Sequence, residues 1–432
     1  ENGTVSRRIF SDDEIYRLEM ERIFGRCWLV LGHESLIPNP GDYFTNYMGE
    51  DPVIVCRDVA GKVRVFLNTC RHRGNTVCLF DRGNTRAFTC SYHGWSYDTT
   101  GKLVGVPFLE EAYYGKLDKD ASGLVEARVA SFCGLIFGCW DKQAVPIDEY
   151  LGDFGWYMKQ LYFAEELQLA VHPQKYMTAT NWKLPSDNFA GDHYHTSITH
   201  ATSRILGMFG RITEHQTDTG RFEVALGMHS LGGLETGGRD ILERDRTRAE
   251  SLGPEVVAWL AERHARWQNR MADVPAQAKS FSRGNIFPNF SFSGSGGGSA
   301  FGSISFYLWH PRGPGKTEVW HWCAVERGAP EAAKQAAIVS SSRGGLSGAG
   351  FFGQDDSANF EGVTKNTRPY VSSLVPMRYD MSMEYEGEWP GQESWVVGGL
   401  PGEIGPNFSE HNQRRFYSVW ASLMRDERPS HG

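Results

Sequence analysis

Two short segments each combine a cysteine with a histidine at spacings that suit metal binding. Cys70 and His72 are separated by one residue, and Cys90 and His93 by two. Each pair lies on a turn beside predicted strands, so two matched loops can converge on one site. Two thiolates and two imidazoles can hold either a tetrahedral Zn²⁺ or a [2Fe–2S] cluster whose second iron carries two histidines.

The distribution of these ligands favours the iron–sulfur cluster over zinc. A zinc finger commonly places its two cysteines together and its two histidines together, whereas each loop here offers one of each. Two irons with unlike ligand pairs require such an arrangement. Gly74 and Gly94 would let the backbone come close to bridging sulfides. The remaining cysteines form no comparable pair and are predicted to be buried thiols.

A second segment crowds polar side chains between aromatic ones. Asn188, Asp192 and His195 fall at i, i+4 and i+7, so a helix would present them on one face. His200 would be rotated by about 140° from His195, so the helix must widen or break if both histidines hold one metal. His193 would lie about 160° from His195 and is left out of the ligand set.

Two imidazoles from one segment and one carboxylate from elsewhere form the facial triad of non-haem Fe(II) oxygenases, which leaves coordination positions open for oxygen. Gln354-Asp355-Asp356 follows a glycine-rich stretch that ends beside Phe351 and Phe352. An Asp-Asp pair taken alone is more typical of a solvated turn. With the two histidines upstream, it predicts the carboxylate of a mononuclear iron site.

The elements that would position these residues fall into two domains. Residues 36–150 contain short β-rich runs separated by turns and predict a small all-β domain. Residues 1–35 and 151–432 predict an α+β domain entered by a helix of about 15 residues. The further elements expected in it are helices over Asp153–Glu166, Pro254–Arg270, Pro330–Val339 and His411–Arg425, and antiparallel strands over Ser303–Trp309 and Thr317–Val325.

Charge and composition exclude several classes of protein. The chain has 432 residues and carries 44 Lys+Arg against 52 Asp+Glu, a net charge of −8, which is unlike a nucleic-acid binder. Its longest largely apolar stretch, Phe132–Trp140, is about half of what a membrane-spanning helix needs, and no charged-then-apolar leader opens the sequence. Eight cysteines are too few for a disulfide scaffold. We therefore expect a cytoplasmic globular protein with neither a nucleic-acid nor a membrane partner.

Together and in this order, the motifs resemble those of the catalytic (large, alpha) subunit of Rieske non-haem iron aromatic-ring-hydroxylating dioxygenases, the naphthalene and biphenyl dioxygenase group. The resemblance spans nearly the whole chain. It rests on Cys70-Arg71-His72-Arg73-Gly74, Cys90-Ser91-Tyr92-His93-Gly94-Trp95, Asn181-Trp182-Lys183, Asn188 to His200, Ile286-Phe287-Pro288-Asn289 and Gln354-Asp355-Asp356. It implies an α+β protein with a small all-β Rieske [2Fe–2S] domain and a catalytic domain whose antiparallel sheet is surrounded by helices.

The resemblance also implies roles for the matched residues. The implied ligands are Cys70, His72, Cys90 and His93 for the cluster, and His195, His200 and Asp356 for mononuclear iron. Asp355 is the alternative third ligand. Asp192 would be the bridging carboxylate that links a Rieske histidine of one subunit to an iron-ligating histidine of its neighbour, and Asn188 is expected in the same catalytic group.

The implied activity is that of a terminal oxygenase component, which uses O2 and NADH-derived electrons to cis-dihydroxylate an aromatic substrate. One [2Fe–2S] cluster and one Fe(II) per chain are expected, with O2 as cosubstrate. The implied partners are a small beta subunit, in an α3β3 assembly with a trimer of catalytic subunits, and a ferredoxin and/or reductase. One alternative is a Rieske-type monohydroxylase of an acidic arene such as a salicylate. Another is an electron carrier or structural metal module whose second set of residues only packs helices.

Residues that would contact the substrate are less clearly marked. Phe189, Leu346 and Phe352 are candidates for the walls of an arene pocket. Arg283, close to Ile286-Phe287-Pro288-Asn289, is a candidate for binding a substrate carboxylate or phenolate, although an arginine there is more often a surface or interface residue. The chain departs from similar enzymes at the residue before Gln354-Asp355-Asp356. Similar enzymes often have a Glu at this position, whereas this chain has Gly353.

Overall fold

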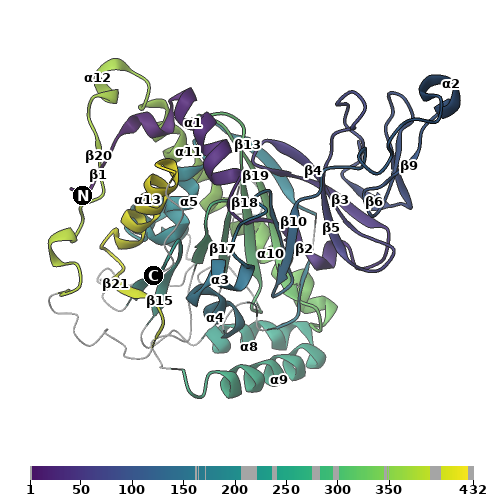
Figure 1. Cartoon of the computed structure of the whole chain (residues 1–432). Coiled ribbons are helices and arrows are strands. Elements are labelled where there is room, and N and C mark those ends of the chain that lie inside the picture. The colour runs from purple at the N-terminus through teal and green to yellow at the C-terminus, as the bar shows by residue number, and fades with distance from the viewer. Residues whose placement is uncertain are drawn as a thin grey trace. The chain divides into compact units, whose positions relative to one another are not determined.

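The computed structural model describes residues 2–160, 163, 165–170, 172–205, 221–235, 241–274, 283–294, 301–344, 348, 350–389 and 400–426. The chain divides into two compact units (Figure 1). Unit 1 comprises Glu1–Ile23 and Asp148–Gly432, and unit 2 comprises Phe24–Ile147.

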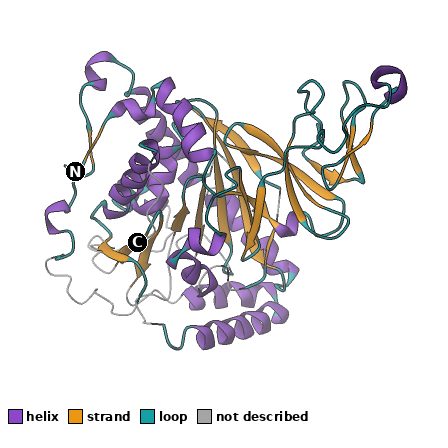
Figure 2. Cartoon of the chain, viewed as in Figure 1, coloured by secondary structure: helices purple, strands orange, loops and turns teal. Residues whose placement is uncertain are grey.

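Unit 2 is built mainly from short antiparallel strands (Figure 2). They form a four-stranded sheet of order β5-β4-β3-β6 and two three-stranded sheets, β7-β8-β9 and β10-β11-β2. The strands are β2 (Leu29–His33), β3 (Asp42–Met48), β4 (Asp51–Arg57), β5 (Val63–Leu67), β6 (Arg82–Asn84), β7 (Ala87–Thr89), β8 (Ser96–Asp98), β9 (Leu103–Gly105), β10 (Arg128–Phe132) and β11 (Leu135–Cys139), and a short helix is α2 (Leu109–Tyr113). Cys70 and Cys90 lie in its buried core, beside Trp95 and Tyr97.

Unit 2 begins at Phe24 rather than at the predicted residue 36. The residues before position 36 include β2, which is buried throughout and pairs antiparallel with β11, with Leu135 opposite His33 and Gly138 opposite Leu29. A buried strand must satisfy its backbone groups with a neighbouring strand, so this pairing makes residues 29–33 part of the β unit.

An antiparallel sheet forms the centre of unit 1. Its order is β12-β19-β18-β17-β16-β15-β14-β21, and β13 pairs with β19 as well. The strands are β12 (Leu167–Leu169), β13 (Gln174–Thr178), β14 (Arg221–Leu226), β15 (His229–Glu235), β16 (Arg283–Ile286), β17 (Phe290–Gly294), β18 (Ile304–Pro311), β19 (Thr317–Glu326) and β21 (Glu403–Pro406), and a separate pair is β1 (Thr4–Val5) with β20 (Met377–Arg378). The strands predicted over Ser303–Trp309 and Thr317–Val325 correspond to β18 and β19.

Helices surround this sheet. They are α1 (Asp13–Glu19), α3 (Ile147–Leu151), α4 (Asp153–Gln160), α5 (Lys183–Gly191), α6 (Thr196–Thr199), α7 (Ala201–Ile205), α8 (Ile241–Leu252), α9 (Pro254–Arg270), α10 (Glu331–Gly344), α11 (Phe351–Lys365), α12 (Tyr370–Ser373) and α13 (His411–Met424). The predicted lead-in helix is shorter than expected, because α1 ends at Glu19 and a π-helical turn over Met20–Phe24 follows. Among the described residues, no helix has both the length and the apolar character needed to cross a membrane.

Alternating side chains of β18 show which helices share a face of the sheet. Ser305 and Tyr307 point to the same side of the strand. Ser305 Oγ lies 3.3 Å from Oγ of Ser341 on α10, and the Tyr307 ring lies 4.8 Å from that of Phe189 on α5. Helices α5 and α10 therefore pack on one face. The predicted fold class, a small all-β domain with an antiparallel sheet surrounded by helices, is confirmed.

Candidate metal centres and catalytic site

The loops that carry the Cys and His pairs in unit 2 have the same local structure. The carbonyl of Cys70 accepts from the Gly74 amide at 2.9 Å, and the carbonyl of Cys90 accepts from the Gly94 amide at 2.9 Å. Both glycines have φ of +73°, a conformation that favours glycine. The Cys70 loop follows β5, and the Cys90 loop joins β7 to β8.

The four candidate ligands of unit 2 are arranged with sulfur inside and nitrogen outside. Cys70 and Cys90 are buried, whereas His72 and His93 are partly exposed and their ring centroids lie 4.5 Å apart. Burial alone would raise the pKa of the Cys90 thiol, but backbone amides and the Asn75 side chain donate to the sulfur and lower its pKa. Buried thiolates with two imidazoles at the rim fit a [2Fe–2S] cluster with unlike ligand pairs.

A different set of side chains could hold a single ion. Within the part of the chain that the structure describes, one group of three ligand atoms from His, Cys, Asp or Glu lies within 4.8 Å of one another, and it consists of His195, His200 and Asp356. The Cys and His residues of unit 2 are thus not gathered round one point as a single zinc ion would require.

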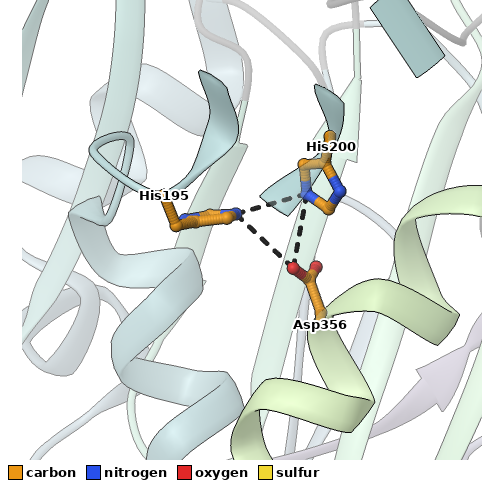
Figure 3. A group of neighbouring side chains, drawn as sticks. All are labelled: His195, His200 and Asp356. Carbon is orange, nitrogen blue, oxygen red and sulfur yellow. Dashed lines mark hydrogen bonds and ion pairs between the residues drawn. The ribbon is translucent and has the colours of Figure 1, made fainter. Parts of the chain in front are cut away.

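The three atoms of this group form a nearly equilateral triangle (Figure 3). Nε2 of His195 lies 3.3 Å from Nε2 of His200, and Oδ1 of Asp356 lies 3.5 Å and 3.3 Å from these two nitrogens. Such a triangle suits one ion bound by two imidazoles and a carboxylate, with positions open on the other side. The Asp356 carboxylate also acts on His200: burial would lower the pKa of this imidazole, but Asp356 and Asp355 together raise it.

The backbone breaks where both histidines must face one ion, but earlier than the sequence suggested. Helix α5 ends at Gly191, and Asp192 caps it in an extended conformation. His195 and His200 flank the single turn of α6 instead. Asn188, Asp192 and His195 therefore do not share the face of one helix, and a turn brings them together.

Each candidate iron-binding histidine has a carboxylate at its other ring nitrogen. Nδ1 of His195 lies 3.1 Å from Oδ2 of Asp192 and 3.2 Å from the side-chain amide of Asn188. Nδ1 of His200 lies 3.6 Å from Oδ2 of Asp355. Such carboxylates fix the orientation and tautomer of a metal-binding imidazole. The adjacent acids thus differ in position, because Asp356 faces both Nε2 atoms and Asp355 lies behind His200.

Buried polar contacts hold α5 along its length. At its start, Nζ of Lys183 lies 2.5 Å from Oε1 of the fully buried Glu19, which also accepts from the Trp182 indole at 2.8 Å. In its middle, Asp187 accepts from the Tyr417 hydroxyl at 2.7 Å, and burial raises the pKa of Asp187 to about 7. These contacts give Asn181-Trp182-Lys183 a structural role that its sequence did not reveal.

The end of α5 is packed too tightly for any side chain at Gly191. A Cβ atom there would lie 2.3 Å from Oε2 of Glu223 and 2.8 Å from Cβ of Asn412. Asn412 donates to the Ala190 carbonyl at 2.7 Å, so α13 satisfies one of the last carbonyl groups of α5. Asn412 thus occupies a carbonyl that would accept from the amide of residue 194 if the helix continued past Gly191.

One of the predicted pocket residues, Phe352, lies beside the triad, and Phe189 packs on the central sheet. The Phe352 ring is 4.9 Å from the His200 ring, and Phe189 packs against Tyr307 and Trp309. Leu346 lies outside the described residues.

Sequence reasoning missed two tyrosines near Asp356. The negative charge of Asp356 contributes to the raised pKa of both Tyr176 and Tyr307, although burial is the main cause. Their positions in ordinary strands carried no signal in the sequence.

Comparisons with known proteins agree with both halves of this description. Residues 27–127 match the Rieske [2Fe-2S] domain, and residues 166–426 match the ring hydroxylating alpha subunit (catalytic domain). Chlorobenzene dioxygenase subunit alpha from Cupriavidus sp. (strain PS12) is 38% identical over 427 residues, covering 98% of this chain and 91% of the relative. Biphenyl 2,3-dioxygenase subunit alpha from Rhodococcus jostii (strain RHA1) is 36% identical over 432 residues, covering 98% of this chain and 89% of the relative.

A similar solved structure is naphthalene 1,2-dioxygenase from Rhodococcus sp. bound to indole, with a TM-score of 0.83 and 34% identity over 99% of this chain and 95% of that one. A Rieske domain joined to a ring-hydroxylating catalytic domain defines a Rieske-type non-haem iron oxygenase. The chain belongs to the alpha subunits of aromatic ring-hydroxylating dioxygenases. The relatives named here are dioxygenases, which favours the predicted dioxygenase over a salicylate-type monohydroxylase.

Proposed function

We propose that this chain binds one [2Fe–2S] cluster and one Fe(II) and adds both atoms of O2 to an aromatic ring, giving a cis-dihydrodiol. The observation that carries the proposal is the triangle of His195 Nε2, His200 Nε2 and Asp356 Oδ1, with sides of 3.3 to 3.5 Å. When bound, iron at this triad would supply open coordination positions for oxygen, and the cluster would supply electrons.

The proposed ligands follow from the orientation of the side chains. Nε2 of His195 and of His200 and one carboxylate oxygen of Asp356 would hold the iron. Asp355 supports His200 through Nδ1 rather than binding the ion itself. In unit 2, Cys70 and Cys90 would bind one iron of the cluster, and His72 and His93 the other.

Asp192 is proposed to connect the two centres. Its carboxylate accepts from Nδ1 of His195 and, with a side chain 32% exposed, retains surface through which to meet a second imidazole. In the assembly we propose, a trimer of alpha subunits with three small beta subunits, that imidazole is His93 of the neighbouring subunit. The side-chain amide of Asn188 donates to Oδ2 of Asp192 at 3.4 Å and so helps to hold this carboxylate beside the His195 ring.

The proposed substrate is an arene, with electrons delivered from NADH by a reductase and/or a ferredoxin. Phe352 presents aromatic surface beside the triad and Phe189 on the central sheet, which suits an apolar ring. The named relatives act on chlorobenzene and biphenyl, and a structural neighbour on naphthalene, which supports the same substrate class here.

Metal analysis and turnover test this proposal. The purified protein should contain three irons per chain with acid-labile sulfide, and it should convert benzene, biphenyl or naphthalene to a cis-dihydrodiol when NADH and partner electron-transfer proteins are supplied. Two irons per chain without turnover would indicate an electron carrier only. Zinc in place of iron would exclude the oxygenase.

A further inference from the structure

Arg283 and His193 form a buried pair close to the turn that follows α5. Nη1 of Arg283 lies 2.7 Å from Nδ1 of His193, and the two residues are 9% and 5% exposed. A guanidinium carries donors only, so Nδ1 of His193 accepts this hydrogen bond. The sequence pointed to Arg283 only as a possible substrate ligand and set His193 aside, and the function proposed above uses neither.

The sheet gives Arg283 a rigid base. Arg283 lies opposite Gly232 on β15 and opposite Ser293 on β17, so β16 is paired on both sides. Ser293 in turn lies opposite Ser305, and residues directly opposite one another point to the same face. The Arg283 side chain therefore rises from the face on which α5 packs.

His193 lies within the segment that Arg283 would have to control. Asp192 ends α5 with an extended backbone, so the chain from Asp192 to His195 is a turn rather than a helix. Oδ1 of Asp192 accepts from the His195 amide at 3.2 Å, and its Oδ2 faces Nδ1 of the same residue. A fixed His193 ring thus restrains this turn, and Asp192 is its neighbour in the chain.

The charges around Arg283 agree with this arrangement. A buried guanidinium needs a negative partner, because desolvating an unpaired charge is costly. Asp192 and Glu223 both interact with Arg283 electrostatically. Burial raises the pKa of Glu223 to about 8, whereas hydrogen bonds from Ser409 and Asn412 and the charge of Arg283 oppose this rise. Arg283 in turn lowers the pKa of Asp192, so its positive charge favours the ionised carboxylate on the turn that carries His193.

We propose that Arg283 and His193 together act as a positioning device for Asp192. Arg283, anchored on β16, holds the His193 ring, and the ring holds the turn that sets the Asp192 carboxylate against His195. Both are positioning residues rather than ligands of iron or substrate. The inference rests on the proposed function, because the placement of Asp192 matters for turnover only if this carboxylate connects the two centres.

The test measures electron transfer in the holoenzyme rather than overall activity alone. The cluster is first reduced, and the protein is then mixed with O2 and naphthalene. The re-oxidation of the cluster and the formation of product are both followed in a single turnover. We expect Arg283→Met and His193→Leu each to slow re-oxidation about ten-fold while iron, sulfide and the KM for naphthalene stay unchanged. His193→Asn places an oxygen near the position of Nδ1 and should restore most of the rate.

A double variant and a matched control sharpen the result. Arg283→Met combined with His193→Leu should be no slower than either single variant, because both remove one interaction. The control is Arg270→Met, which removes another arginine of unit 1. Arg270 lies on α9 and pairs with Glu165 at 2.8 Å, so its loss should leave re-oxidation at the wild-type rate. Equal slowing in this control would show a general loss of stability and overturn the proposal.

Asp192→Asn separates failure of this inference from failure of the proposed function. If Asp192→Asn blocks re-oxidation but Arg283→Met and His193→Leu do not, the positioning role is wrong and the bridging role stands. If Asp192→Asn itself re-oxidises normally, the bridging role fails. A higher KM for an acidic arene such as salicylate in Arg283→Met, without slower re-oxidation, would make Arg283 a substrate ligand. Should Arg283→Met not fold, the two His193 variants decide the matter.

Discussion

The two candidate metal centres are assembled in different ways. The four residues proposed to bind the cluster lie between Cys70 and His93, in loops that repeat the same hydrogen bond and the same glycine conformation. The proposed iron ligands instead come from the turns around α6 and from α11, which are distant in sequence. One centre is thus local, and the other depends on how helices pack on a sheet.

The two centres are therefore sensitive to different substitutions. The loops of unit 2 need glycines and flanking strands, which are supplied within a few residues. In unit 1, α5 ends at Gly191 before the turn that leads to the triad, and there Glu223 on β14 and Asn412 on α13 leave no room for a side chain. Changes in unit 1 should therefore affect iron and electron transfer without altering the cluster, and changes near the cluster should leave iron in place.

The largest separation of the two centres is expected for Asp356→Ala. Two histidines alone should hold Fe(II) poorly, so mononuclear iron is lost and product falls by at least about 100-fold. The visible spectrum of the cluster should stay intact, because its ligands lie in unit 2. Iron analysis and the spectrum of one preparation test both statements.

Asp355→Ala is the matched variant for this experiment. Asp355 lies behind His200, at 3.6 Å from Nδ1, and its loss should weaken iron binding less than the loss of Asp356. Retained iron in Asp356→Ala together with lost iron in Asp355→Ala would reverse the assignment of the two acids.

Asp192→Asn should disconnect the centres while both remain filled. The amide keeps the shape of the side chain but removes the charge that accepts from Nδ1 of His195, 3.1 Å away. We expect single-turnover re-oxidation of the reduced cluster to slow by about 10- to 100-fold, with normal iron and sulfide contents. Re-oxidation coupled to product at the wild-type rate would contradict the bridging role.

Gly191→Ala should damage only the centre that depends on tertiary packing. The new methyl group would meet Glu223 and Asn412, and overpacking of this kind costs about 1–3 kcal/mol of the free energy of unfolding. Iron should bind more weakly because the turn after α5 is displaced. Gly362→Ala on α11 is the control: its Cβ meets nothing within 4 Å, so it should stabilise slightly. Thermal unfolding of both variants measures whether Gly191→Ala lowers the stability and Gly362→Ala raises it.

The smallest effect is expected for Tyr97→Phe in unit 2. The Tyr97 hydroxyl lies 3.3 Å from Sγ of Cys70, and hydrogen bonds to ligand sulfurs help to set the potential of an iron–sulfur cluster. Removal of this donor should lower the reduction potential of the cluster and leave mononuclear iron unchanged. A spectroscopic redox titration measures the shift, and an unchanged potential would show that Tyr97 does not donate to the sulfur.

Local patterns predicted much of this molecule. The Cys-x-His and Cys-x2-His pairs with their glycines indicated a cluster before any fold was known, because loops of this kind are built from neighbouring residues. The helix predicted over Pro254–Arg270 coincides with α9, since its boundaries are marked by Pro254 and an apolar stripe. His195, His200 and an acidic turn could be proposed as a triad from chemistry alone.

Long-range contacts decided the rest. Residues 29–33 belong to the β unit because β11 pairs with them, and nothing within the strand itself indicates its partner. At the end of α5, Asn412 of the distant α13 donates to the Ala190 carbonyl, and the hydrogen bond between His193 and Arg283 joins a turn to a strand. Spacing could not separate Asp355 from Asp356, because which of two adjacent carboxylates faces both histidines depends on how α11 packs beside the turns around α6.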